Sequence, residues 1–156
     1  MGSKNGQVQS PYSDGAGDLP AWSMRPSRVL RKLRAGETVL SIKVNLSDVR
    51  AAEILARSGF DCLWLDMEHV PNDLRETEAM IYAAKAWDVD AVVRVKRGSY
   101  SDMVTPLEAD AAGVMVPHVM SAEDAREVAY RLRFHPIGRR PLDGGNSDGG
   151  YCVIPT

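Results

Sequence analysis

The 156-residue sequence has few cysteines, no long apolar run and little net charge, and each shortage excludes a class of protein. Cys62 and Cys152 are far apart and belong to no CxxC pair, so neither a disulfide framework nor a structural zinc site is expected, and the reducing cytoplasm is the predicted compartment. The apolar runs fall short of the roughly 20 residues of a membrane helix, and the polar N-terminus lacks a signal-peptide core. A net charge of −2 gives no electrostatic footprint for nucleic acid.

The chain begins with a segment that lacks any hydrophobic period. Residues 1–24 are rich in Gly, Ser, Asp and Pro and predict a flexible N-terminal tail. Ser27 then predicts the N-cap of a short basic helix, RVLRKLRAG, that ends at Gly36. Its charges would also suit a membrane-surface or calmodulin-type helix. With only three apolar residues, it is better interpreted as a helix packed under a domain.

From residue 39 onward, four short apolar runs alternate with helical periods. The runs start near residues 39, 62, 91 and 114 and read VLSIKV, CLWLD, AVVRV and VMVPHV. Such continuous hydrophobicity is typical of strands buried on both faces of a parallel sheet. The four segments between and after them place apolar residues on one helical face each: Val49, Ala52 and Leu55; Leu74, Ile81 and Ala84; Val104, Leu107 and Ala111; and Ala125, Val128 and Leu132.

Local signals mark where the helices begin and end. Ser121 to Asp124 predicts a capping box at the start of the fourth helix of the repeat. Gly59 and Gly113 fall where a helix should stop before the next strand. After Pro136 the sequence becomes a Gly-rich loop, which we assign to residues 141–156.

Strand–helix alternation of this kind predicts consecutive βαβ units, for which two architectures compete. A doubly wound open sheet that binds dinucleotides is disfavoured, because no GxGxxG follows the first strand. A (β/α)8 TIM barrel needs about 250 residues. Residues 25–140 are therefore predicted to form the first four βα units of such an α/β barrel, about half of it.

Polar residues gather where the predicted strands end, which is where parallel α/β folds bind ligands. Asp66, Glu68 and His69 follow the second strand, Arg94 lies in the third, and His118 ends the fourth. Each has a structural interpretation as well: Asp66 as a loop cap, His118 as a hydrogen-bonded structural residue, and Arg94 as the partner of a protein carboxylate. A guanidinium keeps its charge, so a buried Arg94 requires an anion from the protein or from a ligand.

These residue types suit proton transfer beside an anionic oxo-acid. His69 would carry the proton, and Asp66 or Glu68 would fix its tautomer. Arg94 would stabilise an oxyanion or enolate. Although Lys43 and Lys96 lie near strand ends, neither is clearly placed for a Schiff base, so an enolate would need a metal, with Glu68 as the best ligand candidate.

At this point the sequence resembles the HpcH/HpaI aldolase/citrate lyase family, in its pyruvate-aldolase branch. The resemblance runs through GFDCLWLDMEHVPND, AVVRV, AAGVMVPHVMSAEDARE and RFHPIGRR, and so covers about residues 30–140. The stretch GDLPAWSMRPSRVLRKLRAG, together with His118 after Val-Pro, is similar to macrophomate-synthase-like members. One departure is Pro141, which follows Arg140 where the family usually has glycine.

The resemblance implies a TIM-barrel lyase that uses Mg²⁺ or Mn²⁺ and acts on small oxo-acids through a pyruvate enolate, usually as a homo-oligomer. It implies that His69 and Asp66 form the proton-transfer dyad, that Arg94 lies against the enolate oxygen, and that His118 lines the pocket. It also implies that a Glu and an Asp of later strands hold the metal. The sequence ends before such strands, and Glu108 and Asp110 belong to a helix and its end.

Two other functions stay open on this sequence. A truncated barrel without catalysis would serve as an interaction or regulatory partner, or have no role. A CoA-thioester lyase of the same superfamily is the third possibility, although the Glu68–His69 pair favours free oxo-acids.

Overall fold

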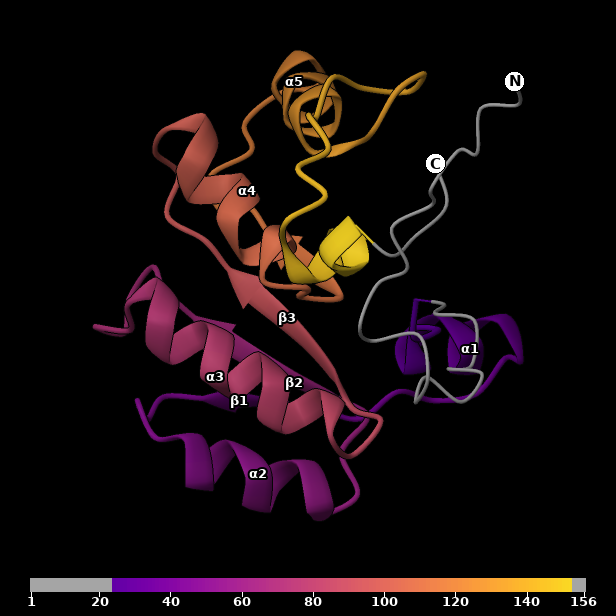
Figure 1. Ribbon diagram of the computed structural model, residues 1–156, viewed down its shortest axis with the longest axis vertical. Helices are drawn as coiled ribbons and strands as arrows, with labels where there is room; N and C mark the ends of the chain where they lie inside the picture. The colour runs from indigo at the N-terminus through magenta and orange to yellow at the C-terminus, as the bar shows by residue number, and fades with distance from the viewer. Residues whose placement is uncertain (1–23, 153–156) are drawn as a thin grey trace, which may run out of the picture.

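The structure, a computed structural model, describes residues 24–152, so nearly all of the expected N-terminal tail lies outside it. Helices and strands alternate along the described chain (Figure 1). In chain order they are α1 (Arg28–Arg34), β1 (Ser41–Val44), α2 (Val49–Arg57), β2 (Cys62–Asp66), α3 (Leu74–Lys85), β3 (Asp90–Arg94), α4 (Tyr100–Glu108), β4 (Gly113–Met115), α5 (Ala122–Leu132) and the 3-10 helix η1 (Ser147–Cys152).

The four strands form one parallel sheet in the order β1-β2-β3-β4. Asp66, the last residue of β2, lies opposite Arg94, the last residue of β3, and Lys43 of β1 lies opposite Trp64. Figure 1 shows α2 and α3 side by side along one side of the sheet, with α1 at the end where β3 begins. Consecutive βα units are thereby confirmed.

The two faces of the sheet differ in what covers them. On the helix-covered face, apolar side chains such as Leu63, Leu65 and Val93 have no exposed surface and pack among buried residues of α2 and α3. Burial of each leucine stabilises the fold by about 2 kcal/mol. Because side chains alternate along a strand, Trp64 and Arg94 point to the other face, where they are only half-buried. The expectation of strands buried on both faces therefore holds at Cys62 and Asp66 but is wrong at Trp64 and Arg94.

At the N-terminal ends of the strands, α1 is held through the buried Asp90 carboxylate. Ser27, confirmed as the N-cap of α1, donates its hydroxyl to Asp90 at 2.5 Å, and the Val29 backbone N–H donates at 2.9 Å. The guanidinium of Arg25 donates to the same carboxylate at 2.5 Å. Burial works against ionisation of Asp90, but these donors outweigh it and lower the pKa of this carboxyl.

Asp61, just before β2, makes a second buried connection to α1. Its carboxylate accepts from the Leu40 backbone N–H at 2.9 Å, from Lys32 at 2.7 Å and from Arg28 at 2.8 Å. The Leu40 hydrogen bond, followed by that of Lys32, lowers the pKa of Asp61 to about 2. The basic residues of α1 therefore serve the domain, as expected for a helix packed beneath it.

The helix ends confirm some local signals and correct others. Capping boxes begin α3 at Asp73 and α4 at Ser99. Ser121 is the N-cap of α5, but the expected box there is wrong, because the carboxylate of Asp124 accepts from Met120 and Arg97 rather than from the cap backbone. Gly59 ends α2 with a φ of +93°, whereas Gly113 is the first residue of β4.

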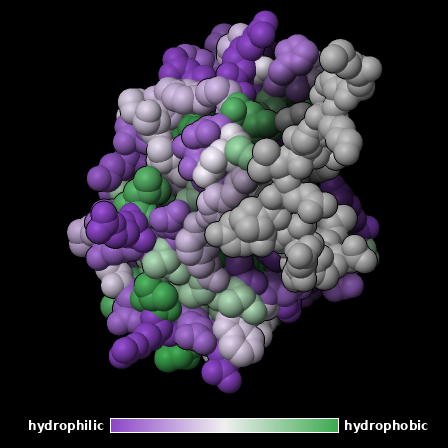
Figure 2. All heavy atoms as spheres, in the orientation of Figure 1, coloured by the Kyte–Doolittle hydropathy of each residue, from purple (hydrophilic) through white to green (hydrophobic). Residues whose placement is uncertain are grey.

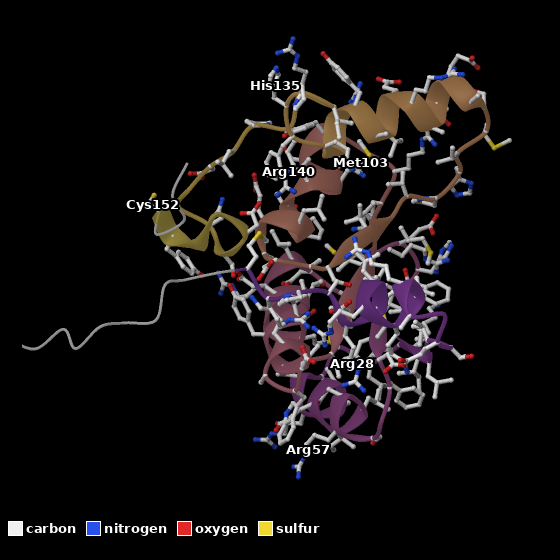
Figure 3. The ribbon with its side chains drawn as sticks, turned by 90° about the vertical axis from the view of Figure 1, so that its right-hand side faces the viewer. Arg28, Arg57, Met103, His135, Arg140 and Cys152 are labelled. Carbon is white, nitrogen blue, oxygen red and sulfur yellow. The ribbon has the colours of Figure 1, made fainter. Side chains whose placement is uncertain are left out.

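The segment expected as a Gly-rich loop contains η1, which packs on α4. Arg140 lies between α4 and this segment (Figure 3), pairs with Asp148 and places its guanidinium 4.6 Å from the centre of the Phe134 ring. At Gly149 a Cβ would lie 2.8 Å from the Cα of Gly144, so only glycine allows this approach. Arg140 thus anchors the C-terminal part of the described chain.

Both outer strands have an open edge in the part of the chain that the structure describes. In the sheet, β1 pairs with β2 and β4 pairs with β3. Val128 and Leu132, expected on the packed face of α5, are partly buried there, and Leu132 packs against the core. Figure 2 shows a mostly hydrophilic surface with separate hydrophobic patches on the side viewed there. Between residues 24 and 152, no helix has both the length and the apolarity to cross a membrane.

The open sheet edges predict that the 156-residue chain by itself self-associates, because unpaired backbone donors and acceptors and apolar surface favour pairing. Sedimentation velocity at micromolar concentration should show species larger than a monomer. A single monomeric boundary that does not change with concentration would contradict this expectation.

The Asp61 contacts predict that Asp61→Asn lowers the free energy of unfolding by about 3 kcal/mol, since it leaves Arg28 and Lys32 without their carboxylate. A carboxyl whose pKa is lowered in the folded state stabilises it above the unfolded-state pKa, and this contribution disappears as the pH falls toward the folded-state value of about 2. Urea titrations at pH 7 and at pH values between 4 and 2 measure both effects.

In these titrations, Arg126→Ala on the exposed surface of α5 is the matched control and should leave the midpoint unchanged. Equal midpoints for Asp61→Asn and the parent at pH 7 would show that the Asp61 contacts do not hold α1.

Candidate functional site

The expected residues come together at the C-terminal ends of the strands. Asp66 and Arg94 end β2 and β3, Glu68 and His69 follow β2, and His118 follows β4. His118 therefore lies in the loop after the strand, three residues beyond Met115, and not in the strand itself as the sequence predicted. This loop position lets the imidazole reach the residues that follow β2.

The Asp66 carboxylate is fully buried and accepts from five donors. Arg94 donates from Nε at 3.0 Å and from Nη2 at 2.5 Å, and Lys43 approaches Oδ2 at 2.9 Å. The backbone N–H groups of Glu68 and His69 donate at 2.9 and 3.2 Å. Burial alone would raise the pKa of Asp66, but the hydrogen bonds from Arg94 and Lys43 hold it far below the usual range. Asp66 is thus an anion that organises the site.

Arg94 finds its anionic partners within the protein. Besides its two bonds to Asp66, its Nε lies 3.2 Å from Glu68, and its guanidinium carbon lies 5.2 Å from the centre of the Trp64 ring. The Asp66 hydrogen bond raises the pKa of Arg94. Its Nη1 has no hydrogen-bond partner among the described residues, so this edge of the guanidinium can donate to a ligand.

Glu68 is the carboxylate that joins the two imidazoles. Its Oε1 lies 3.1 Å from Nε2 of His118, and its Oε2 lies 3.4 Å from Nε2 of His69. The Glu68 side chain is 13% exposed, whereas those of His69 and His118 are 66% and 72% exposed. Two solvent-accessible imidazoles on one nearly buried carboxylate are suited to proton exchange with a bound molecule.

The family resemblance implies a dyad between the His69 ring and Asp66, and the structure arranges these groups differently. Asp66 accepts the backbone N–H of His69, while the ring lies beside Glu68. Glu68 was the other carboxylate that the sequence offered for fixing the His69 tautomer. With five donors on Asp66, the carboxylate nearest the His69 ring is Glu68, at 3.4 Å.

The loop that carries His118 is held by a residue that the sequence did not single out. Arg97 donates to the carbonyl oxygens of Pro117 and His118 and pairs with Asp124, which in turn accepts the Met120 backbone N–H at 2.9 Å. The Arg97 hydrogen bond lowers the pKa of Asp124. His118 has a φ of +54°, a conformation that costs a non-glycine residue about 1–2 kcal/mol. The hydrogen bonds from Arg97 hold the loop in this conformation and offset that cost.

A second supporting contact lies under the loop between β2 and α3. The buried Asn72 donates to the backbone oxygen of Asp66 at 2.8 Å and accepts from the Ser47 hydroxyl at 2.5 Å. Asn72 and Arg97 thus hold the backbone on which site residues lie, and Lys43 contacts the Asp66 carboxylate. Only Lys43 gave a signal in the sequence, because it lies near the end of a strand.

The site offers one carboxylate to a divalent metal. Asp66 is saturated with donors, which leaves Glu68 among the described residues, and Mg²⁺ prefers several oxygen ligands. No group of three or more His, Cys, Asp or Glu residues arranged for a metal occurs between residues 24 and 152. Glu108 ends α4 and Asp110 precedes β4, so neither follows the C-terminal end of a strand, and Asp110 pairs with Lys85. The described residues therefore offer Glu68 as a candidate metal ligand and not a complete set.

Comparison with known proteins identifies the relatives of this arrangement. Residues 42–152 match the family model described as HpcH/HpaI aldolase/citrate lyase. The chain belongs to this family. The match begins within β1 and includes β2, β3, β4 and all of the candidate site residues, in agreement with the resemblance of the sequence to this family.

Curated relatives within the family are aldolases. The hydroxypyruvate/pyruvate aldolase of Roseobacter denitrificans is 36% identical over 123 residues, which are 79% of this chain and 45% of the relative. The 2-keto-3-deoxy-L-rhamnonate aldolase of Klebsiella pneumoniae is 35% identical over 115 residues, 74% of this chain and 43% of the relative. The chain thus spans less than half the length of these relatives.

Solved structures give the same picture of the fold. A HpcH/HpaI aldolase/citrate lyase family protein from Burkholderia cenocepacia superimposes with a TM-score of 0.73 at 30% identity, over 81% of this chain and 52% of the other. Macrophomate synthase superimposes with a TM-score of 0.66 at 27% identity, over 77% and 41%. The four βα units are therefore those of a TIM-barrel aldolase, and they correspond to about half of that barrel.

The Arg97 contacts predict that Arg97→Met loosens the His118 loop without unfolding the domain. Loss of the two carbonyl hydrogen bonds and of the Asp124 pair should speed hydrogen exchange of the Met120 N–H by about tenfold and shift the His118 imidazole resonances. NMR hydrogen exchange measures the first change. Arg126→Met, which removes an exposed pair on α5, is the control. Unchanged exchange in Arg97→Met would show that Arg97 does not hold the loop.

Proposed function

We propose that this chain carries the proton-transfer part of a carbon–carbon lyase, an aldolase or decarboxylase that acts on small oxo-acids through a pyruvate enolate. The observation that supports it most is the placement of Arg94 between two carboxylates, with two imidazoles on the second. The relatives named hydroxypyruvate/pyruvate aldolase and 2-keto-3-deoxy-L-rhamnonate aldolase support the same substrate chemistry.

In this proposal each residue has a task. Nη1 of Arg94 donates to the substrate oxygen that gains negative charge as the enolate forms. Because the guanidinium is already held in position, it stabilises this charge without reorganising. His69 takes up and returns the proton at the substrate carbon, with Glu68 fixing its ring. His118 lines the substrate pocket from the loop after β4, and Asp66 keeps Arg94 oriented.

The enolate chemistry also requires an electrophile. A divalent metal, Mg²⁺ or Mn²⁺, would polarise the substrate carbonyl when bound. Glu68 is the residue of this chain proposed to contact it, and further ligands would come from outside residues 24–152. The free thiols of Cys62 and Cys152 agree with a reducing compartment, and we place the reaction in the cytoplasm. We propose a homo-oligomer, or assembly with a complementary half, as the active form.

The test uses a chimera in which this chain is joined to the complementary C-terminal half of the Roseobacter denitrificans relative. With Mg²⁺, the chimera should exchange the methyl protons of pyruvate for deuterium, followed by proton NMR. His69→Ala should slow this exchange by about 10²-fold or more, because the proton carrier is removed. The 156-residue chain by itself should show no Mg²⁺-dependent decarboxylation of oxaloacetate.

His135→Ala is the matched control for His69→Ala. His135 projects outward after α5 (Figure 3), at a distance from the strand ends, so its loss should leave the exchange rate unchanged. A folded chimera without exchange would contradict the proposed lyase and favour the non-catalytic alternative. Equal rates for His69→Ala and the parent would refute the role of His69 alone.

A further inference from the structure

Two cations lie against the same tryptophan and share one carboxylate. Lys43 of β1 is paired in register with Trp64 of β2, and its Nζ lies 5.3 Å from the centre of that ring. Arg94 belongs to β3, the strand on the other side of β2, and its guanidinium carbon lies 5.2 Å from the centre of the same ring. Oδ2 of Asp66 accepts from Lys43 at 2.9 Å and from Arg94 at 2.5 Å. Lys43 is thus part of the site, although nothing in the comparisons or in the proposed mechanism gives it a task.

The charges of the site show what Lys43 adds. Asp66 and Glu68 carry two negative charges, and Arg94, which contacts both, carries one positive charge. Without Lys43 these three residues have a net charge of −1, and a carboxylate ligand would be repelled. With Lys43 the net charge is zero. Among these four residues, Lys43 thus cancels the negative charge that would repel a carboxylate ligand.

The same contact governs how Arg94 is shared. Asp66 is fully buried, so its charge must be met by nearby donors. If Lys43 were absent, Oδ2 would depend on Arg94 alone, and the attraction between the two would hold the guanidinium more tightly to Asp66. The Lys43 side chain is 31% exposed, and the approach of its ammonium to the indole ring offsets part of the lost hydration. The contact is therefore fixed rather than a chance surface pair.

We propose that Lys43 is a positioning residue for anion binding: it neutralises Asp66 and thereby leaves Arg94 available to the carboxylate or enolate oxygen of an oxo-acid. This inference rests on the proposed function for the identity of the ligand. It adds a residue of β1 to a site otherwise made by residues of β2, β3 and the loop after β4. It also predicts that Lys43 makes the site bind anionic oxo-compounds more tightly than neutral ones.

The experiment titrates the 156-residue chain with pyruvate and follows the indole N–H resonance of Trp64 by NMR. Lys43→Gln and Lys43→Met remove the charge, and Met keeps the aliphatic stem that packs on Trp64. Both should raise the apparent Kd for pyruvate by about tenfold or more, the usual effect of losing a charge-assisted contact. Lys43→Arg, which keeps the charge, should stay within about threefold of the parent.

Two controls separate charge from structure. Lys96→Gln removes an exposed lysine near another strand end and should not change the Kd. Pyruvamide, which has the shape of pyruvate without its charge, should bind the parent and Lys43→Gln equally. A merely structural Lys43 would instead alter the binding of both compounds by the same factor.

Several results would overturn the inference: no saturable shift with the parent chain, equal pyruvate affinity for the parent and the neutral variants, weak binding by a folded Lys43→Arg, or loss of fold in both neutral variants. Because the readout is binding, it is independent of turnover. An inactive chimera together with binding that depends on Lys43 would refute the lyase and leave the anion site standing.

Discussion

The site depends on the ionisation of one buried carboxylate. Asp66 has no exposed surface, yet it carries a charge because Arg94, Lys43 and two backbone N–H groups surround it. This single anion fixes the guanidinium, the start of the loop after β2, and the lysine of the neighbouring strand. An apolar residue at this position would leave Lys43 and two N–H groups without this acceptor, and Arg94 with Glu68 alone. The positions of Arg94, Lys43 and the loop after β2 therefore all depend on the Asp66 carboxylate.

The two ends of the sheet use similar chemistry for different purposes. At the N-terminal ends of the strands, Asp61 and Asp90 bind α1 and its basic residues, which fixes a helix. At the C-terminal ends, Asp66 and Glu68 bind cations and imidazoles that stay partly open to solvent. Buried carboxylates thus serve stability at one end and the arrangement of the site at the other. The apolar layer of Leu63, Leu65 and Val93 separates the two.

The fold could be predicted from the sequence because its signals are local and periodic. The CLWLD run and the AVVRV run fall on β2 and β3, and Ser27 is the N-cap of α1. The capping box at Ser121 failed because Asp124, which should have closed it, is used by Arg97 from a distant part of the chain. The partial exposure of Trp64 and Arg94 could not be predicted either, since the second face of a sheet depends on what packs against it.

For the candidate site, the sequence predicted which residues lie close together but not which of them pair. Strand ends brought Asp66, Glu68, His69, Arg94 and His118 together, as parallel topology requires. Which carboxylate lies beside the His69 ring depends on side-chain directions within three residues after β2, and the strand period does not reach that far. Arg97 and Asn72 could not be predicted, because they donate to backbone oxygen atoms, and every residue type has such an atom.

The left-handed backbone of His118 has a consequence for how the site can evolve. A glycine at this position would relieve the conformational cost of a positive φ, so the loop would become easier to form as its imidazole disappeared. Under the role proposed for His118, selection for stability and selection for activity therefore act in opposite directions at this position. Asparagine, which tolerates the same backbone region, is the natural intermediate on that route.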